Sequence, residues 1–100
     1  MVKITALVLT ALATLTAARN CTPGLDYCGY ILRDIATANN YDAQMTAALR
    51  KLGVPVNESS MTHGLFYCIP GGDGDVRALA VCANGCLNGG KERNDFCKLP

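Results

Sequence analysis

The chain has 100 residues, six of them cysteine, and a formal net charge of +1 at pH 7. This length allows a single small domain with a limited hydrophobic core. The near-neutral charge, without a cluster of lysine and arginine, disfavours nucleic-acid binding and electrostatic attachment to an anionic membrane surface.

The first 18 residues predict a cleaved secretory signal peptide. Lys3 precedes an apolar run, and Thr16 and Ala18 are small residues at the −3 and −1 positions of a cleavage after Ala18. A membrane anchor is the alternative, but the apolar run of about 15 residues is shorter than the roughly 20 that a spanning helix needs. We therefore expect a secreted, extracellular protein without a membrane span. Its single domain covers residues 19–100, with eight basic and eight acidic residues once Lys3 is removed.

The cysteines predict a disulfide framework, because their number is even and the chain is short and secreted. All six follow the predicted cleavage site: Cys21, Cys28, Cys68, Cys82, Cys86 and Cys97. Three bridges at roughly 2–4 kcal/mol each would supply much of the stability of so small a domain. Many pairings are possible. The glycine-rich segment between Cys86 and Cys97 favours a bridge between these two, which leaves the other four to join the N-terminal segment to the hairpin described below.

The first predicted helix has apolar side chains at intervals of three and four residues: Cys28, Ile31, Leu32 and Ile35. Asp26 precedes this run and is the expected N-cap. Alternation also allows a strand over residues 30–35, since the two isoleucines are β-branched. We favour the helix, which should end in the poor helix formers at residues 37–40.

The second predicted helix has one apolar face: Tyr41, Met45, Ala48, Leu49 and Leu52. Asn40 is the expected N-cap, and Arg50 and Lys51 suit the negative end of the helix dipole. Gly53 is expected at the left-handed C′ position, with Pro55 blocking continuation. A dibasic processing site at Arg50 and Lys51 is the alternative, but the last turn of a helix explains the pair.

Residues 54–63 show no strong pattern and predict a polar connection. Within it, Asn57 begins an Asn-x-Ser tripeptide and is a candidate site for N-linked glycosylation. Asn20 begins a second such tripeptide but lies almost at the new N-terminus, so Asn57 is the better candidate.

A β-hairpin is predicted over residues 65–83. Its strands cover residues 65–69 and 76–83, and the glycine- and aspartate-rich residues 70–75 form the loop. One face of the second strand should carry Val76, Ala78, Ala80 and Cys82, and the other Arg77, Leu79 and Val81. We expect Leu49 and Phe66 to share a core between the second helix and this hairpin. The tail beyond residue 83 should be looped, because it contains Asn-Gly and Gly-Gly pairs.

No catalytic grouping is recognisable, so we expect a protein that is not an enzyme and has no cofactor or metal. His63 is the single histidine, and oxidised cysteines cannot serve as its nucleophile. Cys82 and Cys86 lack the spacing of a zinc site. Asp73 and Asp75 could approach a cation, but further acidic ligands are missing and a hairpin turn explains them.

Several segments together resemble a family of small cysteine-rich secreted proteins of filamentous fungi. They are Cys21-Thr-Pro-Gly-Leu-Asp-Tyr-Cys-Gly29, Tyr41-x-x-Gln44, Leu65-Phe-Tyr-Cys68 with Gly71-Gly72, Cys82-x-x-Gly-Cys86-x-x-Gly-Gly90 and Asp95-Phe-Cys97. These proteins are candidate effectors similar to the subunits of a virally encoded smut-fungus killer toxin. The resemblance covers nearly the whole mature chain and implies an α+β fold, a disulfide-stapled two-layer sandwich with two helices on an antiparallel sheet. The family carries no catalytic residues that could be transferred.

We therefore expect a secreted, monomeric, non-enzymatic effector that binds a host or extracellular protein and no nucleic acid. Asp73 and Asp75 in the hairpin loop are the candidate recognition residues. The alternatives are a killer-toxin-like antimicrobial protein and a secreted hydrolase inhibitor. A near-neutral chain without a basic amphipathic helix weighs against direct membrane disruption.

Overall fold

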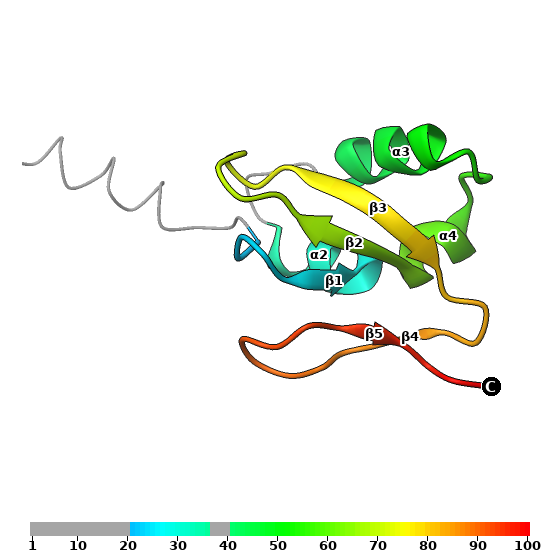
Figure 1. Ribbon diagram of the computed structural model, residues 1–100. Coiled ribbons are helices and arrows are strands. Elements are labelled where there is room, and N and C mark those ends of the chain that lie inside the picture. The colour runs from blue at the N-terminus through cyan, green and yellow to red at the C-terminus, as the bar shows by residue number, and fades with distance from the viewer. Residues whose placement is uncertain (1–20, 37–40) are drawn as a thin grey trace, which may run out of the picture.

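The computed structural model describes residues 21–36 and 41–100 (Figure 1). Its elements are β1 (Asp26–Cys28), α2 (Gly29–Ile35), α3 (Tyr41–Leu52), α4 (Glu58–His63), β2 (Gly64–Cys68), β3 (Val76–Val81), β4 (Cys86–Leu87) and β5 (Phe96–Cys97). The predicted signal peptide, its cleavage site after Ala18, the Asn20 tripeptide and the Asn40 cap lie outside the described residues. Within the described part of the chain, no helix is long and apolar enough to span a membrane.

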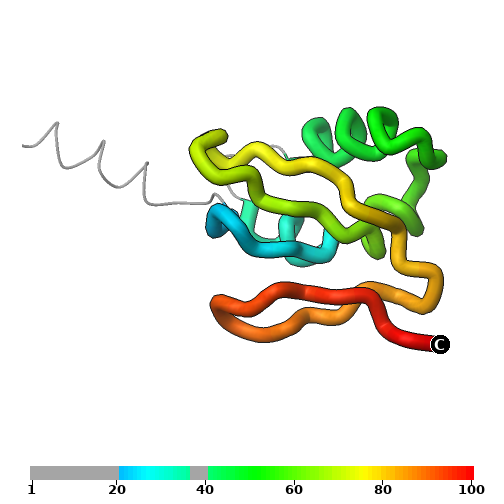
Figure 2. Tube along the Cα trace, viewed as in Figure 1, coloured from blue at the N-terminus to red at the C-terminus, as the bar shows by residue number. Residues whose placement is uncertain are grey.

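The fold is α+β, as predicted. Strands β1, β2 and β3 form an antiparallel sheet with β2 in the middle, and β2 and β3 are the predicted hairpin. The helices pack on the face of the sheet that carries Phe66 and Cys68, and α3 runs beside β3 (Figures 1 and 2). The third strand, β1, was not predicted, because only its pairing with β2 makes residues 26–28 extended.

One hydrophobic core joins the helices to the sheet. Its buried members are Cys21, Leu32, Tyr41, Met45, Ala48, Leu49, Met61, Phe66, Cys68 and Val76. Leu49 and Phe66 are both fully buried in it, as predicted. The expected face of α3 is also confirmed, except that Leu52 in its last turn is 40% exposed. Leu52 lies beside the groove between α3 and β3, where the helix no longer packs closely on the sheet.

The helix ends follow the predicted signals in one case only. Gly53 has φ +86° and its N–H donates to the Leu49 carbonyl, the expected end of α3. Asp26, by contrast, does not cap α2: it pairs with Tyr67 in the sheet, and Cys28 occupies the N-cap without a side-chain hydrogen bond. Because Asp26 pairs with β2, the strand continues to Cys28 and the helix begins at Gly29, so Asp26 lies two residues before the N-cap position.

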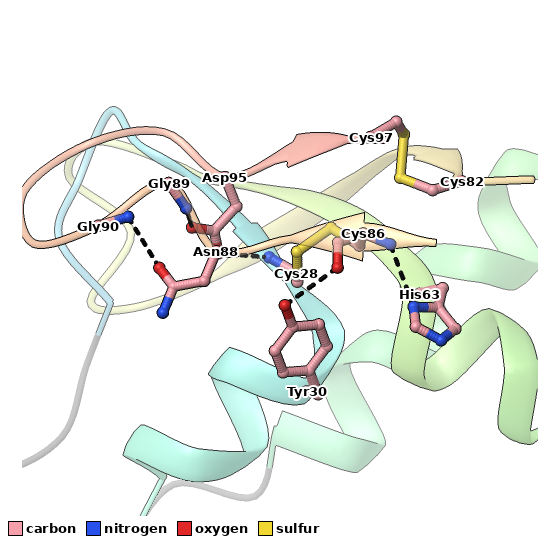
Figure 3. Close-up of a disulfide and its surroundings, with 10 residues drawn as sticks. All are labelled: Cys28, Tyr30, His63, Cys82, Cys86, Asn88, Gly89, Gly90, Asp95 and Cys97. Atoms are coloured by element: carbon pink, nitrogen blue, oxygen red, sulfur yellow. Dashed lines mark hydrogen bonds between the residues drawn. A yellow bond between two sulfur atoms is a disulfide. The ribbon is translucent and has the colours of Figure 1, made fainter. Parts of the chain in front are cut away.

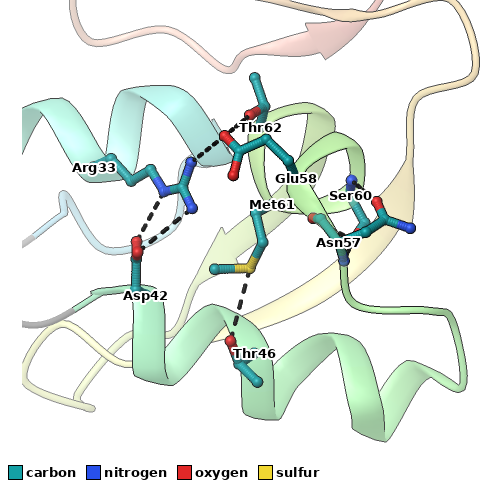
Figure 4. A network of polar contacts seen from close by, with 8 residues as sticks. All are labelled: Arg33, Asp42, Thr46, Asn57, Glu58, Ser60, Met61 and Thr62. Atoms are coloured by element: carbon teal, nitrogen blue, oxygen red, sulfur yellow. Dashed lines mark hydrogen bonds and ion pairs between the residues drawn. The ribbon is translucent and has the colours of Figure 1, made fainter.

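Residues 58–63 form a helix, so the prediction of a polar connection over residues 54–63 was wrong for its second half. Asn57 and Ser60 make a capping box: the Asn57 side chain accepts from the Ser60 N–H, and the Ser60 hydroxyl accepts from the Asn57 N–H, both at 2.9 Å (Figure 4). Met61 packs into the core and holds this short helix there. The sequence contains this capping box, but the residue three positions after the N-cap is usually Glu or Gln, whereas here it is Ser60.

A β-bulge alters the predicted faces of β3. Leu65 is paired with Ala80 and Phe66 with Ala78, so Leu79 is the extra residue. The alternation therefore reverses beyond it, and Val81 packs against the core together with Ala78. The prediction that Val81 shares the face of Arg77 was wrong, because a bulge shifts every later side chain to the other face.

The tail contains regular structure that was not predicted. Strands β4 and β5 pair antiparallel, with Cys86 opposite Cys97 and Leu87 opposite Phe96. The glycine-rich segment does bring Cys86 and Cys97 together, as expected. Two strands form where the tail was expected to be looped, because the tail is held against the rest of the domain by disulfides and by Asp95.

The six cysteines form three disulfides: Cys21–Cys68, Cys28–Cys86 and Cys82–Cys97. Their Cα–Cα distances are 6.1, 5.7 and 5.1 Å, within the usual range. The predicted Cys86–Cys97 bridge was wrong. Four cysteines meet in one cluster behind β4 and β5, so several neighbours are within reach of each sulfur, and spacing along the chain cannot choose among them.

Asp95 fastens the tail to the outer edge of β1 (Figure 3). Its buried carboxylate accepts from the N–H groups of Cys28 and Gly89, each at 2.8 Å, and its own N–H donates to the Asp26 carbonyl at 2.9 Å. Burial raises the pKa of the Asp26 carboxyl, and the nearby Asp95 charge adds to this effect. The tail therefore covers one edge of the three-stranded sheet and leaves β3 at the other.

Candidate recognition surface

The loop at residues 70–75 is a compact turn with both candidate aspartates on its surface. The Gly72 N–H donates to the Ile69 carbonyl at 3.3 Å and the Asp75 N–H to the Gly72 carbonyl at 3.0 Å. Asp73 and Asp75 are exposed, and among the described residues neither takes part in an ion pair. The two carboxylates therefore face solvent and can meet a partner without first breaking an internal contact.

Tyr41 anchors this loop from the core. Its buried hydroxyl donates to the Gly74 carbonyl at 2.9 Å and accepts from the Cys21 N–H at 3.0 Å. Gly74 is buried and has φ +91°, a backbone conformation in which a side chain would be strained. Because Cys21 is also bonded to Cys68 at the end of β2, the start of the domain, α3 and the loop are tied together at one point.

A groove runs between α3 and β3, beside the loop. One hollow of this groove has a volume of about 260 Å³ and is lined by Ala48, Lys51, Leu52, Ile69, Val76, Arg77 and Ala78. A second hollow of about 290 Å³ shares several of these residues and extends towards Gln44, Ala47 and Asp75. The sequence did not suggest this groove, because it depends on how α3 lies against the end of the sheet.

Arg33 and its two carboxylate partners form a separate network that joins the three helices (Figure 4). The guanidinium contacts Asp42 of α3 at 2.8 Å and Glu58 of α4 at 2.9 Å. The hydrogen bond from Arg33 lowers the pKa of the Glu58 carboxyl below its usual value, and one from Thr62 adds to this. These groups are occupied by one another, so we assign the network to the packing of the helices.

His63 has a structural role. Its Nδ1 accepts from the Cys86 N–H at 3.1 Å, and its ring packs edge-on against Tyr30, whose hydroxyl donates to the Cys86 carbonyl (Figure 3). Both contacts hold strand β4 against α2 and α4. Within the described residues, no group of three histidine, cysteine, aspartate or glutamate side chains is placed to hold a metal ion.

Asn57 is exposed at the start of α4, and its side-chain oxygen makes the cap described above. A glycan would be attached to the nitrogen of the same amide, so the cap and the modification use different atoms. Glycosylation of Asn57 stays a prediction.

Comparisons with known proteins add no functional residue: no family model matches the chain, and neither a curated protein nor a solved structure is similar enough to it to transfer a fold or an activity.

Proposed function

We propose that the protein is a secreted, non-enzymatic effector that binds a host or extracellular protein through the loop at residues 70–75. We place it with the small cysteine-rich fungal proteins similar to the killer-toxin subunits. The observation that carries the proposal is the anchoring of an exposed, doubly acidic loop by the Tyr41 hydroxyl and the Cys21–Cys68 disulfide.

Rigid presentation favours binding because little conformational entropy is lost when the partner docks. The hydrogen bonds within the turn and the anchor at Gly74 supply that rigidity. Two neighbouring carboxylates favour a partner with a basic patch, since complementary charge speeds encounter and suppresses wrong partners. The three disulfides of so small a domain are typical of extracellular proteins, where such bonds persist.

The test is capture of partners from host extracellular fluid by the wild-type protein and by the double variant Asp73→Asn with Asp75→Asn. Asparagine removes both charges, and it tolerates the φ of +55° at residue 73. We expect an unchanged melting temperature, because both side chains are exposed, and loss of the partner that the wild-type protein captures.

The matched control is Asp34→Asn with Glu92→Gln, which removes the same charge at two exposed residues away from the loop. This control should retain the partner. Capture by the loop variant at the wild-type level would contradict the proposal.

A hydrolase inhibitor is the second candidate, favoured by the same observation, since a braced exposed loop is also what an inhibitor inserts into a cleft. The two candidates differ in the identity of the captured protein. If it is a secreted hydrolase whose activity falls on titration with the wild-type protein and not with the loop variant, the inhibitor function replaces the effector function.

A further inference from the structure

Strand β3 ends the three-stranded sheet, and its outer edge offers backbone groups for pairing. The Cys68 N–H and C=O both bond towards the β1 side, to Leu25 and Gly24, at 2.9 and 2.8 Å. Because Cys68 is opposite Val76, the N–H and C=O of Val76 point away from β2, and those of Ala78 do the same one pair further on. Within the described residues, no other strand pairs with this edge, and no loop makes a backbone–backbone hydrogen bond to it.

The groove between α3 and β3 lies beside these same backbone groups. Val76 and Ala78 line it from the strand and Ala48 from the helix, and the small alanines leave its volume of about 260 Å³ open. Successive side chains of a strand alternate between its two faces. A fourth strand on the edge of β3 would therefore place every second side chain in the groove, beneath α3.

The charges around the groove favour an acidic occupant. Lys51 lines both hollows and Arg77 the first, whereas Asp75 lines only the second, at the end of the groove near the loop. The Arg77 guanidinium lies over the ring of Tyr67 at 4.9 Å, on the sheet face opposite Val76 and Ala78, so Lys51 is the cation that an occupant of the groove would meet. In a bound segment, an apolar side chain could enter the groove while a neighbouring acidic side chain contacts Lys51.

We propose that an extended segment of the partner adds to the edge of β3 as a fourth strand, with an apolar side chain in the α3–β3 groove and an acidic side chain beside Lys51. Main-chain hydrogen bonds to Val76 and Ala78 provide affinity, and the groove and Lys51 provide specificity. This inference rests on the proposed function: the loop meets a basic patch of the partner, and the groove beside it takes a neighbouring extended segment with an apolar and an acidic side chain.

A second copy of the chain is disfavoured as the occupant. If two β3 edges paired antiparallel with Val76 opposite Ala78, the two Arg77 side chains would lie opposite each other on the same face, at the two-fold axis. Both copies would also bring Lys51 towards that interface. Like charges in these positions oppose each other and have no acidic residue of β3 between them.

The test selects binders from a displayed library of random peptides of about 12 residues, enough for a strand of 5–6 with its flanks. One selected peptide is then titrated against the wild-type protein. We expect the selected peptides to carry an acidic residue close to an apolar one. Two copies of that peptide are N-methylated, one at the odd and one at the even residues. We expect one of them to bind at least about tenfold more weakly, which corresponds to 1.4 kcal/mol, because only one alternating set of N–H groups points towards β3.

Two protein variants complete the test. Lys51→Glu should weaken the same peptide by about tenfold or more, since it replaces attraction by repulsion. Ala78→Pro should abolish binding, because it removes an outward N–H while the bonds of β3 to β2 remain. Phe96→Ser is the matched control, at an exposed apolar residue of β5, and should bind as the wild type does.

The proposal is overturned if no peptide is enriched, if N-methylation of neither alternating set weakens the affinity, or if Lys51→Glu binds normally. It is also overturned if light scattering finds a dimer that Ala78→Pro dissociates, because the edge is then an interface between two copies. Lys51→Glu is a surface change, and the N-methylated peptides require no variant, so misfolding of Ala78→Pro does not obscure the result. Loss of the partner by the aspartate variant, combined with normal capture by Lys51→Glu, would retain the proposed function and reject this groove.

Discussion

Replacing Cys28 and Cys86 together by alanine is expected to lower the free energy of unfolding by about 4 kcal/mol. This disulfide joins residues 58 positions apart, so its loss releases a long loop in the unfolded chain. In the folded protein it connects the end of β1 to β4, and both cysteines are buried in the cluster behind the tail. Alanine leaves no unsatisfied polar group there, so the change reports the lost bond and the lost sulfur packing.

Urea denaturation of the oxidised proteins measures this loss. The pair Cys82→Ala with Cys97→Ala is the comparison, since its disulfide closes a separation of only 15 and is expected to cost about 3 kcal/mol. Peptide mapping without reduction must recover Cys28 linked to Cys86. A loss below about 1 kcal/mol for the Cys28 and Cys86 variant would contradict the role of this bond, and a peptide linking Cys86 to Cys97 would contradict the pairing itself.

Leu49→Ala is expected to destabilise the protein by about 2–5 kcal/mol. Leu49 is fully buried between α3 and the sheet, where it shares the core with Phe66. Truncation removes apolar contacts and leaves a cavity that the cross-linked surroundings close only in part.

Leu52→Ala is the matched control for this change. It removes the same atoms from the same helix, but Leu52 is 40% exposed, so we expect about 1 kcal/mol or less. Thermal or urea unfolding measures both variants. Equal losses for the two would show that α3 packs on the sheet through a different face.

The elements that could be predicted are those with local signals. Helix α3 has an apolar stripe, and Gly53 ends it; the hairpin has two apolar runs around a glycine-rich loop. The shared core of Leu49 and Phe66 follows directly from these patterns. Each of these features depends on a pattern of neighbouring residues within one segment, and such a pattern can be recognised in the sequence without knowing the fold.

The features that escaped prediction depend on contacts between distant segments. Asp26 became a strand residue by pairing with Tyr67, and the bulge opposite Leu65 moved Val81 to the core face. The carboxylate of Asp95 holds Cys28, which is 67 positions away in the chain. No local pattern encodes such a partner, and the cysteine pairing has the same origin.

The candidate site was predicted in part. The loop and its two aspartates were found from composition, and the structure places both on the surface beside an anchored turn. The Tyr41 anchor was missed, because in the sequence Tyr41 is one more apolar residue of a helix face. The α3–β3 groove was missed as well, since it exists only where Ala48 and Ala78 come to face each other.

Photo-crosslinking from the loop tests the central claim, recognition by the face that carries residues 70–75. A photoreactive benzoylphenylalanine replaces Pro70 in one protein and Phe96 in another, which leaves both aspartates of the loop in place, and each protein is irradiated in host extracellular fluid. Both positions are exposed, but residue 96 lies on the tail. We predict a discrete adduct from position 70 that excess wild-type protein suppresses, and no such adduct from position 96. An adduct from position 96 alone would contradict the account and place recognition on the tail.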